Sequence, residues 1–297
     1  MSIAEFRNRS PVVTSALLWT IAIIFTVACF SWQDRTGPTY PLEGDLETAH
    51  GTVHFKILRS ETIGSDLAVM LLDPVPVPVS GTVQYRRFKS DDEWSSMSME
   101  RGEFHHSRRG RKGSDRGLGA MLPSLQVRAG KYEFFVFVDD GQGEAVSITG
   151  SDPIYARYKA DVPRIPLMVH ILVVFASMTL ALRTILEAAV GGSFKKLLWW
   201  TIGSLLLGAF VLGPVVQWYA FGVLWAGIPF GYDWTDNKVL LELAFWLLAA
   251  FLNRGDRRNR KVVYLAGLVT LIVYFIPHSV FGSEYNYLTG TGQGTAG

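Results

Sequence analysis

Long apolar runs and short alternating runs divide this chain into two kinds of segment. Four apolar runs are as long as the roughly 20 residues that a helix needs to cross a bilayer core of about 30 Å, and they cover residues 11–32, 165–186, 197–219 and 262–280. A fifth run, residues 239–252, is short, but it gives an adequate span at 236–252 if the helix begins near Thr235 or Asp236. Lipid offers no partner for backbone N–H and C=O groups, so each run must be helical. The pattern therefore predicts about five transmembrane helices.

Residues 33–163 have a different character, because their apolar runs are short and alternate with polar residues as half-buried strands require. The strands expected from this alternation are residues 52–58, 67–72, 81–88, 95–100, 119–122, 131–138, 145–149 and 154–159. Turn-forming pairs such as Asp73-Pro74 and Ala129-Gly130 separate them. Several short strands without an intervening helix favour an antiparallel all-β sandwich.

Basic residues in the short connections predict how the chain is threaded. They gather before the first span, between the second and third, and between the fourth and fifth: Arg7, Arg9, Arg183, Lys195, Lys196, Arg254, Arg257, Arg258, Arg260 and Lys261. The loop 221–238 has one lysine, and the tail after residue 278 has no lysine or arginine. Threading the spans alternately puts all three of these basic clusters on one side. We therefore expect a bacterial inner-membrane protein with residues 1–10 in the cytoplasm, and residues 33–163 and 281–297 in the periplasm. Residues 164–280 would form a four-helix transmembrane domain.

Composition narrows the picture further. A hydrophobic content of 49% fits a membrane protein, and a net charge of +2 gives no reason to expect a nucleic-acid partner. Cys29 is the only cysteine, so no intrachain disulfide can support the exported domain. The first span is longer than the apolar core of a signal peptide, which favours a retained anchor. Lipidation of Cys29 stays open, although the sequence before it is a poor lipoprotein box.

Part of the exported domain resembles an immunoglobulin-like or fibronectin type III-like module. The resemblance spans residues 81–136, and it is carried by Gly81-Thr-Val-Gln-Tyr-Arg-Arg-Phe, Trp94, Met97, Ala120-Met-Leu-Pro123 and Ala129-Gly-Lys-Tyr-Glu-Phe-Phe-Val. In such modules a Tyr-Arg strand leads to a buried Trp, and a later Gly-x-Tyr strand returns across the core. Such modules usually bind other molecules or act as spacers between domains. The resemblance therefore implies interaction rather than catalysis. The whole architecture is similar to polytopic bacterial membrane proteins of no assigned activity.

Polar residues collect near the outer ends of the predicted spans, at His170, Gln217, Glu242 and His278, with Asp233 and Asp236 in the adjoining loop. Ionisable groups within spans are functional candidates by default. Two histidines and a glutamate at one depth would suit a metal ion, a quinol headgroup, a haem or a proton path. The alternative is that these groups satisfy helix ends and tie loops to helices. No cofactor is predicted on this basis alone.

Two further features have both a structural and a functional interpretation. Residues 105–116 are rich in basic side chains: Arg108, Arg109, Arg111, Lys112 and Arg116. They predict a solvated hairpin loop, or a contact for an acidic partner protein or anionic headgroups. Ser204, Gly208 and Gly213 mark the third span as a closely packed and kinked helix.

The sequence contains no Walker, Gly-x-Ser-x-Gly or His-Glu-x-x-His motif. The leading hypothesis is a non-catalytic accessory or scaffold subunit of a larger bacterial membrane complex, such as a respiratory or photosynthetic assembly. Its partners would be the lipid bilayer and other subunits. The alternative is a redox or proton-handling protein that uses His170, Glu242 and His278. A third hypothesis, an envelope sensor, is weakened because the short cytoplasmic loops leave no output domain.

Overall fold

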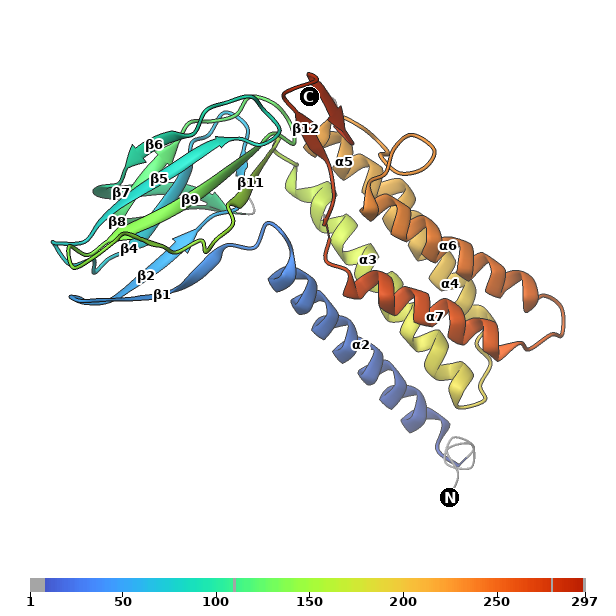
Figure 1. The fold of residues 1–297 in the computed structure, drawn as a ribbon. Coiled ribbons are helices and arrows are strands. Elements are labelled where there is room, and N and C mark those ends of the chain that lie inside the picture. Colours follow the sequence, from blue (N-terminus) through green and yellow to red (C-terminus); the bar gives the residue numbers. More distant parts are fainter. Residues whose placement is uncertain (1–8, 109–110, 279, 296–297) are drawn as a thin grey trace. The chain divides into compact units, whose positions relative to one another are not determined.

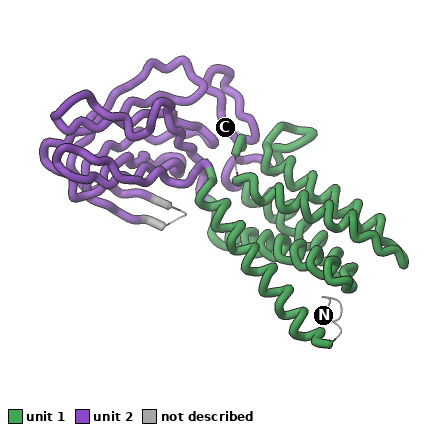
Figure 2. The backbone as a smooth tube through the Cα atoms, turned by 60° about the horizontal axis from the view of Figure 1, so that its bottom comes forward, with its two compact units in different colours: residues 1–37, 162–218, 224–282 green, residues 38–161, 219–223, 283–297 purple. Residues whose placement is uncertain are grey.

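The computed structural model describes residues 9–108, 111–278 and 280–295. The chain forms two compact units, which Figure 2 colours separately. The helical unit comprises Met1–Gly37, Val162–Trp218 and Leu224–Gly282, and the β unit comprises Pro38–Asp161, Tyr219–Val223 and Ser283–Gly297. The same chain therefore enters the β unit three times.

Helices form where the long apolar runs were found (Figure 1). They are α2 (Pro11–Thr36), α3 (Arg164–Ala189), α4 (Lys195–Leu205), the π-helical segment η1 (Leu206–Leu212), α5 (Gly213–Phe221), α6 (Trp234–Leu252) and α7 (Arg260–Phe275). The α4, η1 and α5 segments make one 27-residue helix. A π-helical insertion is a known cause of helix irregularity, so it supplies the distortion expected in this span.

Within the described part of the chain, three helices are long and apolar enough to cross a membrane: α2, α3 and the continuous helix Lys195–Phe221. The chain is thus a membrane-associated protein with both helical and β structure. Length and composition do not support the expected total of five spans. The α7 helix has only 16 residues, because it ends at Phe275 ahead of Pro277 rather than reaching residue 280. The α6 helix carries three ionisable residues, Asp236, Lys238 and Glu242.

Small residues allow close helix packing in this unit. A Cβ added at Gly208 would lie 3.1 Å from Val174 Cγ2 of α3, and one added at Gly267 of α7 would lie 2.2 Å from Ile185 Cδ1. A buried core links α3, α4, α6 and α7, with Trp246 fully enclosed. The Ser204 hydroxyl donates within its own helix, to the Thr201 carbonyl at 3.0 Å.

The β unit is a sandwich of two sheets around one hydrophobic core. The five-stranded sheet has the order β1 (Leu42–Thr48), β2 (Gly51–Ile57), β4 (Leu67–Leu72), β8 (Arg111–Leu122) and β7 (Glu100–Arg108). The other sheet has the order β3 (Ser60–Thr62), β11 (Ile154–Lys159), β9 (Lys131–Asp139), β5 (Ser80–Arg87) and β6 (Ser95–Ser98), with β10 (Val146–Ser147) paired to β9. Every described pair within the two sheets is antiparallel except β3 with β11.

The basic segment 105–116 differs from the expected loop, because it belongs to the long hairpin of β7 and β8. Strand pairing continues to Arg108 opposite Arg111, and His106 is tied to Asp115 across the hairpin at 3.0 Å. Cross-strand hydrogen bonding thus outweighs the loop-like composition. Arg109 lies outside the described residues, as do the side chains of Arg108, Arg111 and Lys112. Arg116, on β8, is exposed.

Residues 283–295 are part of the β unit rather than a free tail. A short hairpin of β12 (Glu284–Asn286) and β13 (Thr291–Gln293) follows the helices. The Tyr285 N–H donates to the Ala129 carbonyl at 3.1 Å, and Glu284 forms ion pairs with Lys89 and with Lys131, the latter at 2.8 Å. Burial raises the pKa of Glu284, but the lysine hydrogen bonds outweigh it and hold that pKa below its ordinary value of 4.5.

Candidate functional site

Three of the six polar residues proposed as a cluster are brought together, and they shape a loop. The Asp233 carboxylate caps α6 by accepting from the Thr235 N–H at 2.8 Å. The Asp236 carboxylate accepts from the Ala226 N–H at 2.6 Å, the Gly227 N–H at 3.1 Å and Gln217 Nε2 at 3.3 Å. These contacts satisfy the buried Asp236 carboxylate with two loop N–H groups and with the Gln217 side chain of α5, so Gln217, Asp233 and Asp236 hold the α5–α6 connection in shape.

Glu242 occupies a separate, fully enclosed position between α6 and α7. Its Oε1 accepts from the Thr270 hydroxyl at 2.9 Å, and that hydroxyl accepts from Trp246 Nε1 at 2.9 Å. Glu242 is 1% exposed, and its Oε2 has no hydrogen-bond partner among the described residues. Lys238, one turn earlier, donates to the Ile276 carbonyl at 2.9 Å. Trp246 thus donates to Thr270, and Thr270 donates to the buried carboxyl group of Glu242.

The two histidines do not join Glu242 in a ligand set. His170 Nδ1 donates to the Gly208 carbonyl at 3.0 Å, on the π-helical segment, and His278 is exposed beyond the end of α7. Among the described residues, no group of three or more His, Cys, Asp or Glu side chains could hold a metal ion. His170, Glu242 and His278 were expected at a similar depth, but the structure does not bring them together into one site.

The outer face of the six-stranded sheet carries a row of aromatic side chains that the sequence analysis did not single out as a surface. Gln84 lies opposite Phe135, and Arg86 lies opposite Glu133, so β5 and β9 present these residues on the same face. Trp94, just before β6, packs against Phe135 with ring centroids 5.4 Å apart. Phe135 continues to Phe137 at 5.9 Å. The result is a continuous aromatic strip on an exposed sheet.

Charged groups fix this strip in place. The Arg86 guanidinium carbon lies 4.6 Å from the Trp94 ring centroid, and Arg86 Nε donates to Glu133 Oε1 at 2.6 Å. The Arg86 side chain remains 35% exposed, and Glu133 takes only one of the five N–H donors of a guanidinium. Stacking and ion pairing together hold an arginine ready for a further acceptor.

The aromatic row continues towards β11. Phe88 and Tyr155 meet edge to face at 4.9 Å, and Lys131 Nζ lies 5.4 Å from the Phe88 ring centroid. We call Phe88, Trp94, Phe135, Phe137 and Tyr155, together with Arg86, the aromatic face. Trp94 itself is 39% exposed. The immunoglobulin-like resemblance implied a buried tryptophan, and the structure instead places Trp94 on the outside.

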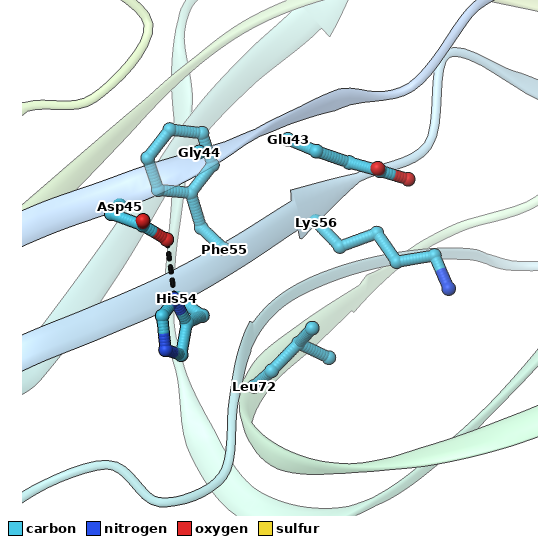
Figure 3. A pocket seen from close by; sticks show the side chains of 7 residues that line it. All are labelled: Glu43, Gly44, Asp45, His54, Phe55, Lys56 and Leu72. Atoms are coloured by element: carbon cyan, nitrogen blue, oxygen red, sulfur yellow. Dashed lines mark hydrogen bonds and ion pairs between the residues drawn. The ribbon is translucent and has the colours of Figure 1, made fainter.

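The outer face of the five-stranded sheet combines an apolar cluster around buried Ala68, Met70 and Phe104 with charged residues. An open pocket there is lined by Glu43, Gly44, Asp45, His54, Phe55, Lys56 and Leu72 (Figure 3). His54 pairs with Asp45, as the dashed line in Figure 3 marks. Asp115 accepts from Lys56 at 3.1 Å and from His106 at 3.0 Å. Burial raises the pKa of Asp115, but these two bonds hold it below its ordinary value of 3.8. The charges in this region satisfy one another.

A sequence signal for the aromatic face does exist in β9. Its core side is formed by Tyr132, Phe134, Val136 and Val138, all buried. Phe135 and Phe137 fall on the opposite side, so the segment 134–137 of this strand is apolar on both faces. A strand that faces water on one side normally alternates apolar with polar residues. The large aromatic residues on the outer side of β9 depart from this alternation.

Comparisons of the chain with protein families, with characterised proteins and with solved structures found no match. The function must therefore be inferred from the residues of this chain.

Proposed function

We propose that this protein is a non-catalytic accessory subunit of a multi-subunit bacterial membrane complex, and that the aromatic face of the β unit binds a neighbouring protein subunit. The observation that carries the proposal is the aromatic strip of exposed Trp94 and half-buried Phe135 and Phe137, braced by the Arg86–Glu133 ion pair. Respiratory and photosynthetic assemblies are examples of complexes with such subunits.

The composition of this face favours a protein partner. Aromatic residues and arginine are enriched at protein interfaces, and tryptophan, tyrosine and arginine dominate the residues that carry binding energy. Trp94, Arg86 and Phe135 are already ordered by contact with one another. Binding therefore costs less side-chain entropy than it would for mobile residues. The exposed N–H groups of Arg86 would suit a carboxylate or carbonyl oxygen of the partner.

We also propose that α6 and α7 cross the bacterial inner membrane together with the three longer helices, which gives five spans with the β unit in the periplasm. The basic connections fall on one side of such a threading. The β unit receives chain after α2, at Tyr219–Val223 after most of α5, and at Ser283–Gly297 after α7. The return of the chain to one unit after its first, third and fifth helix supports the proposal that the helices cross alternately. The α6 and α7 helices also share a buried core with α3 and α4.

Replacing Trp94 and Phe135 together by alanine tests the role of the aromatic face. The matched control is Val77→Ala, because Val77 is 87% exposed as a single apolar side chain in another loop. After gentle solubilisation of native membranes, we expect the wild type and V77A to run as a particle heavier than the monomer that contains a second polypeptide. The double variant should lose that polypeptide. A wild-type protein isolated as a lone monomer would contradict the proposal.

Proton transfer at Glu242 is the second candidate function. The buried and unpartnered Oε2, at the end of the Trp246–Thr270 donor chain, favours it. If Glu242 carries protons, Glu242→Gln should abolish acidification of proteoliposomes driven by an imposed potential, and Thr270→Ser should not. Equal flux in wild type and E242Q would remove this candidate. An absorption spectrum of the purified protein tests the haem and quinol alternatives.

A further inference from the structure

The connection between α5 and α6 is an uncharged loop that points its apolar side chains outward. Residues 221–232 include no Asp, Glu, Lys or Arg. Phe230 is 82% exposed and Tyr232 is 76% exposed, and Leu224, Ile228 and Trp234 are each more than half exposed. We call residues 224–234 the aromatic loop. Most surface loops bury large apolar side chains and expose polar ones. The exposed apolar side chains of this loop therefore indicate that it lies against an apolar environment.

Hydrogen bonds on the inner side of the loop hold this conformation. The Asn237 side chain accepts from the Ile228 N–H at 2.8 Å, in addition to the Asp236 contacts with Ala226 and Gly227. Within the loop, the Phe230 N–H donates to the Gly227 carbonyl at 2.9 Å. The polar backbone groups are therefore satisfied inward, while the apolar side chains are turned outward.

A close backbone approach adds to this rigidity. The Gly231 N–H bonds the Gly227 carbonyl at 3.0 Å, and a Cβ at Gly231 would lie 2.5 Å from the Ala226 carbonyl oxygen. Only glycine fits there. On the outer side, Trp234 meets the 75% exposed Phe281 at 6.4 Å. The loop is thus a fixed display of aromatic rings rather than a flexible linker.

We propose that the aromatic loop inserts into the headgroup region of the lipid bilayer and anchors the helical unit at that depth. It directly continues the helix Lys195–Phe221, one of the three helices suited to crossing a membrane, so its surface is continuous with a lipid-facing one. Trp218 and Tyr219, at the end of that helix, are 54% and 41% exposed. Tryptophan and tyrosine prefer the membrane interface. A protein partner would be expected to meet a charged or polar rim, and the loop sequence supplies none between residues 221 and 232.

Spin-label accessibility tests this proposal in the full-length chain. A single cysteine is placed at position 230 in a Cys29→Ser background, labelled with a nitroxide and reconstituted in phosphatidylcholine vesicles. Matched labels at positions 172 and 142 provide references, because Leu172 is 64% exposed on α3 and Gln142 lies in an exposed turn of the β unit. We expect label 230 to be relaxed more by oxygen than by a water-soluble nickel chelate. Its depth should fall between those of the two references.

Two results would overturn the proposal. Nickel access at 230 equal to that at 142 would place the loop in water. Protection of 230 from both reagents would mean that protein covers it. The variant Gly231→Ala, combined with label 230, adds a second measurement. It should shift label 230 towards nickel access, because its Cβ displaces the loop, and it should leave label 172 unchanged. Unchanged accessibility at 230 in that variant would show that loop geometry does not set the depth.

Discussion

At the scale of single residues, Asp236 illustrates how burial decides the role of a charged group. Its carboxylate would be unfavourable inside the helical unit without partners, and two loop N–H groups and the Gln217 side chain on α5 provide them. Glu242, two turns later on the same helix, has a partner for only one of its oxygens. From the sequence, Asp236 and Glu242 are simply two acidic residues near the start of one span. Only their neighbours in the structure show that Asp236 binds the loop backbone, whereas Glu242 is a candidate proton site.

Gly117→Ala is expected to destabilise the β unit. A Cβ at this position of β8 would lie 1.9 Å from the Leu71 carbonyl oxygen, a backbone atom of the paired strand β4. The strands would have to separate, at a cost of about 3 kcal/mol. Thermal melting of the full-length protein, followed by the β-sheet circular dichroism signal, measures the effect. Gly143→Ala is the control, because nothing lies within 4 Å of its Cβ, and it should leave the melting temperature unchanged.

Thr270→Val is expected to destabilise the helical unit by about 2 kcal/mol. The substitution preserves shape, but it leaves Trp246 Nε1 without its acceptor and Glu242 Oε1 without its donor. Thermal unfolding in detergent, read from tryptophan fluorescence, provides the measurement. Thr270→Ser keeps the hydroxyl and should restore most of the lost stability. Equal melting of the valine variant and wild type would mean that the donor chain does not contribute to stability.

At the scale of elements, the sequence predicted the helices and strands that show a clear hydrophobic pattern within their own residues. Residues 67–72 and 154–159 were expected as strands and coincide with β4 and β11. The helices begin within a few residues of the expected positions. The β7 and β8 hairpin was missed around residues 105–116, because its many charged residues resemble a loop, whereas pairing between the strands depends on residues distant in sequence.

The polar cluster shows a second limit of sequence reasoning. Residue spacing along a helix gives depth, at about 1.5 Å per residue, but not the direction in which each side chain points around the bundle. His170 lies against Gly208, while Glu242 lies against Thr270. Likewise, Trp94 was expected in the core by resemblance, although its position next to Arg86 and Phe135 depends on strand order.

The docking of β12 is expected to weaken in acid. Glu284 has a lowered pKa in the folded protein, so it stabilises the fold above its unfolded pKa, and this contribution is lost as the pH falls through the folded value. Burial, followed by the charge of Arg157, lowers the pKa of Lys131 from 10.5, and this shift makes stability vary with pH only in alkali. Chemical denaturation of the β unit between about pH 5 and pH 3 should therefore show a steeper loss of stability for wild type than for Glu284→Gln.

The control for this pH experiment is Glu144→Gln, because Glu144 lies in an exposed turn. It should retain the wild-type pH dependence. If E284Q and wild type lose stability in parallel, the ion pairs of Glu284 with Lys89 and Lys131 do not hold the hairpin.

At the scale of the whole molecule, the number of membrane crossings decides which side each connection faces. Three helices satisfy the length and composition of a span, and the proposed threading adds α6 and α7. The two alternatives agree on the β unit and on the Ser283–Gly297 segment, which lie outside in both. They differ at the connection between α6 and α7, because that connection is cytoplasmic only if both helices cross. Arg257, which is exposed in this connection, is therefore the informative position.

Cysteine accessibility at position 257 should distinguish the two threadings. In intact cells carrying Cys29→Ser, a membrane-impermeant maleimide is expected to label cysteine at exposed positions 142 and 293, and to label position 257 only after permeabilisation. Five basic residues, Arg254, Arg257, Arg258, Arg260 and Lys261, surround this connection, and such clusters are retained on the cytoplasmic side. Glu242 would then lie within the bilayer, where a buried carboxyl group has its largest electrostatic cost. Labelling of position 257 from outside would leave α6 and α7 on the periplasmic side and remove the proton path through Glu242.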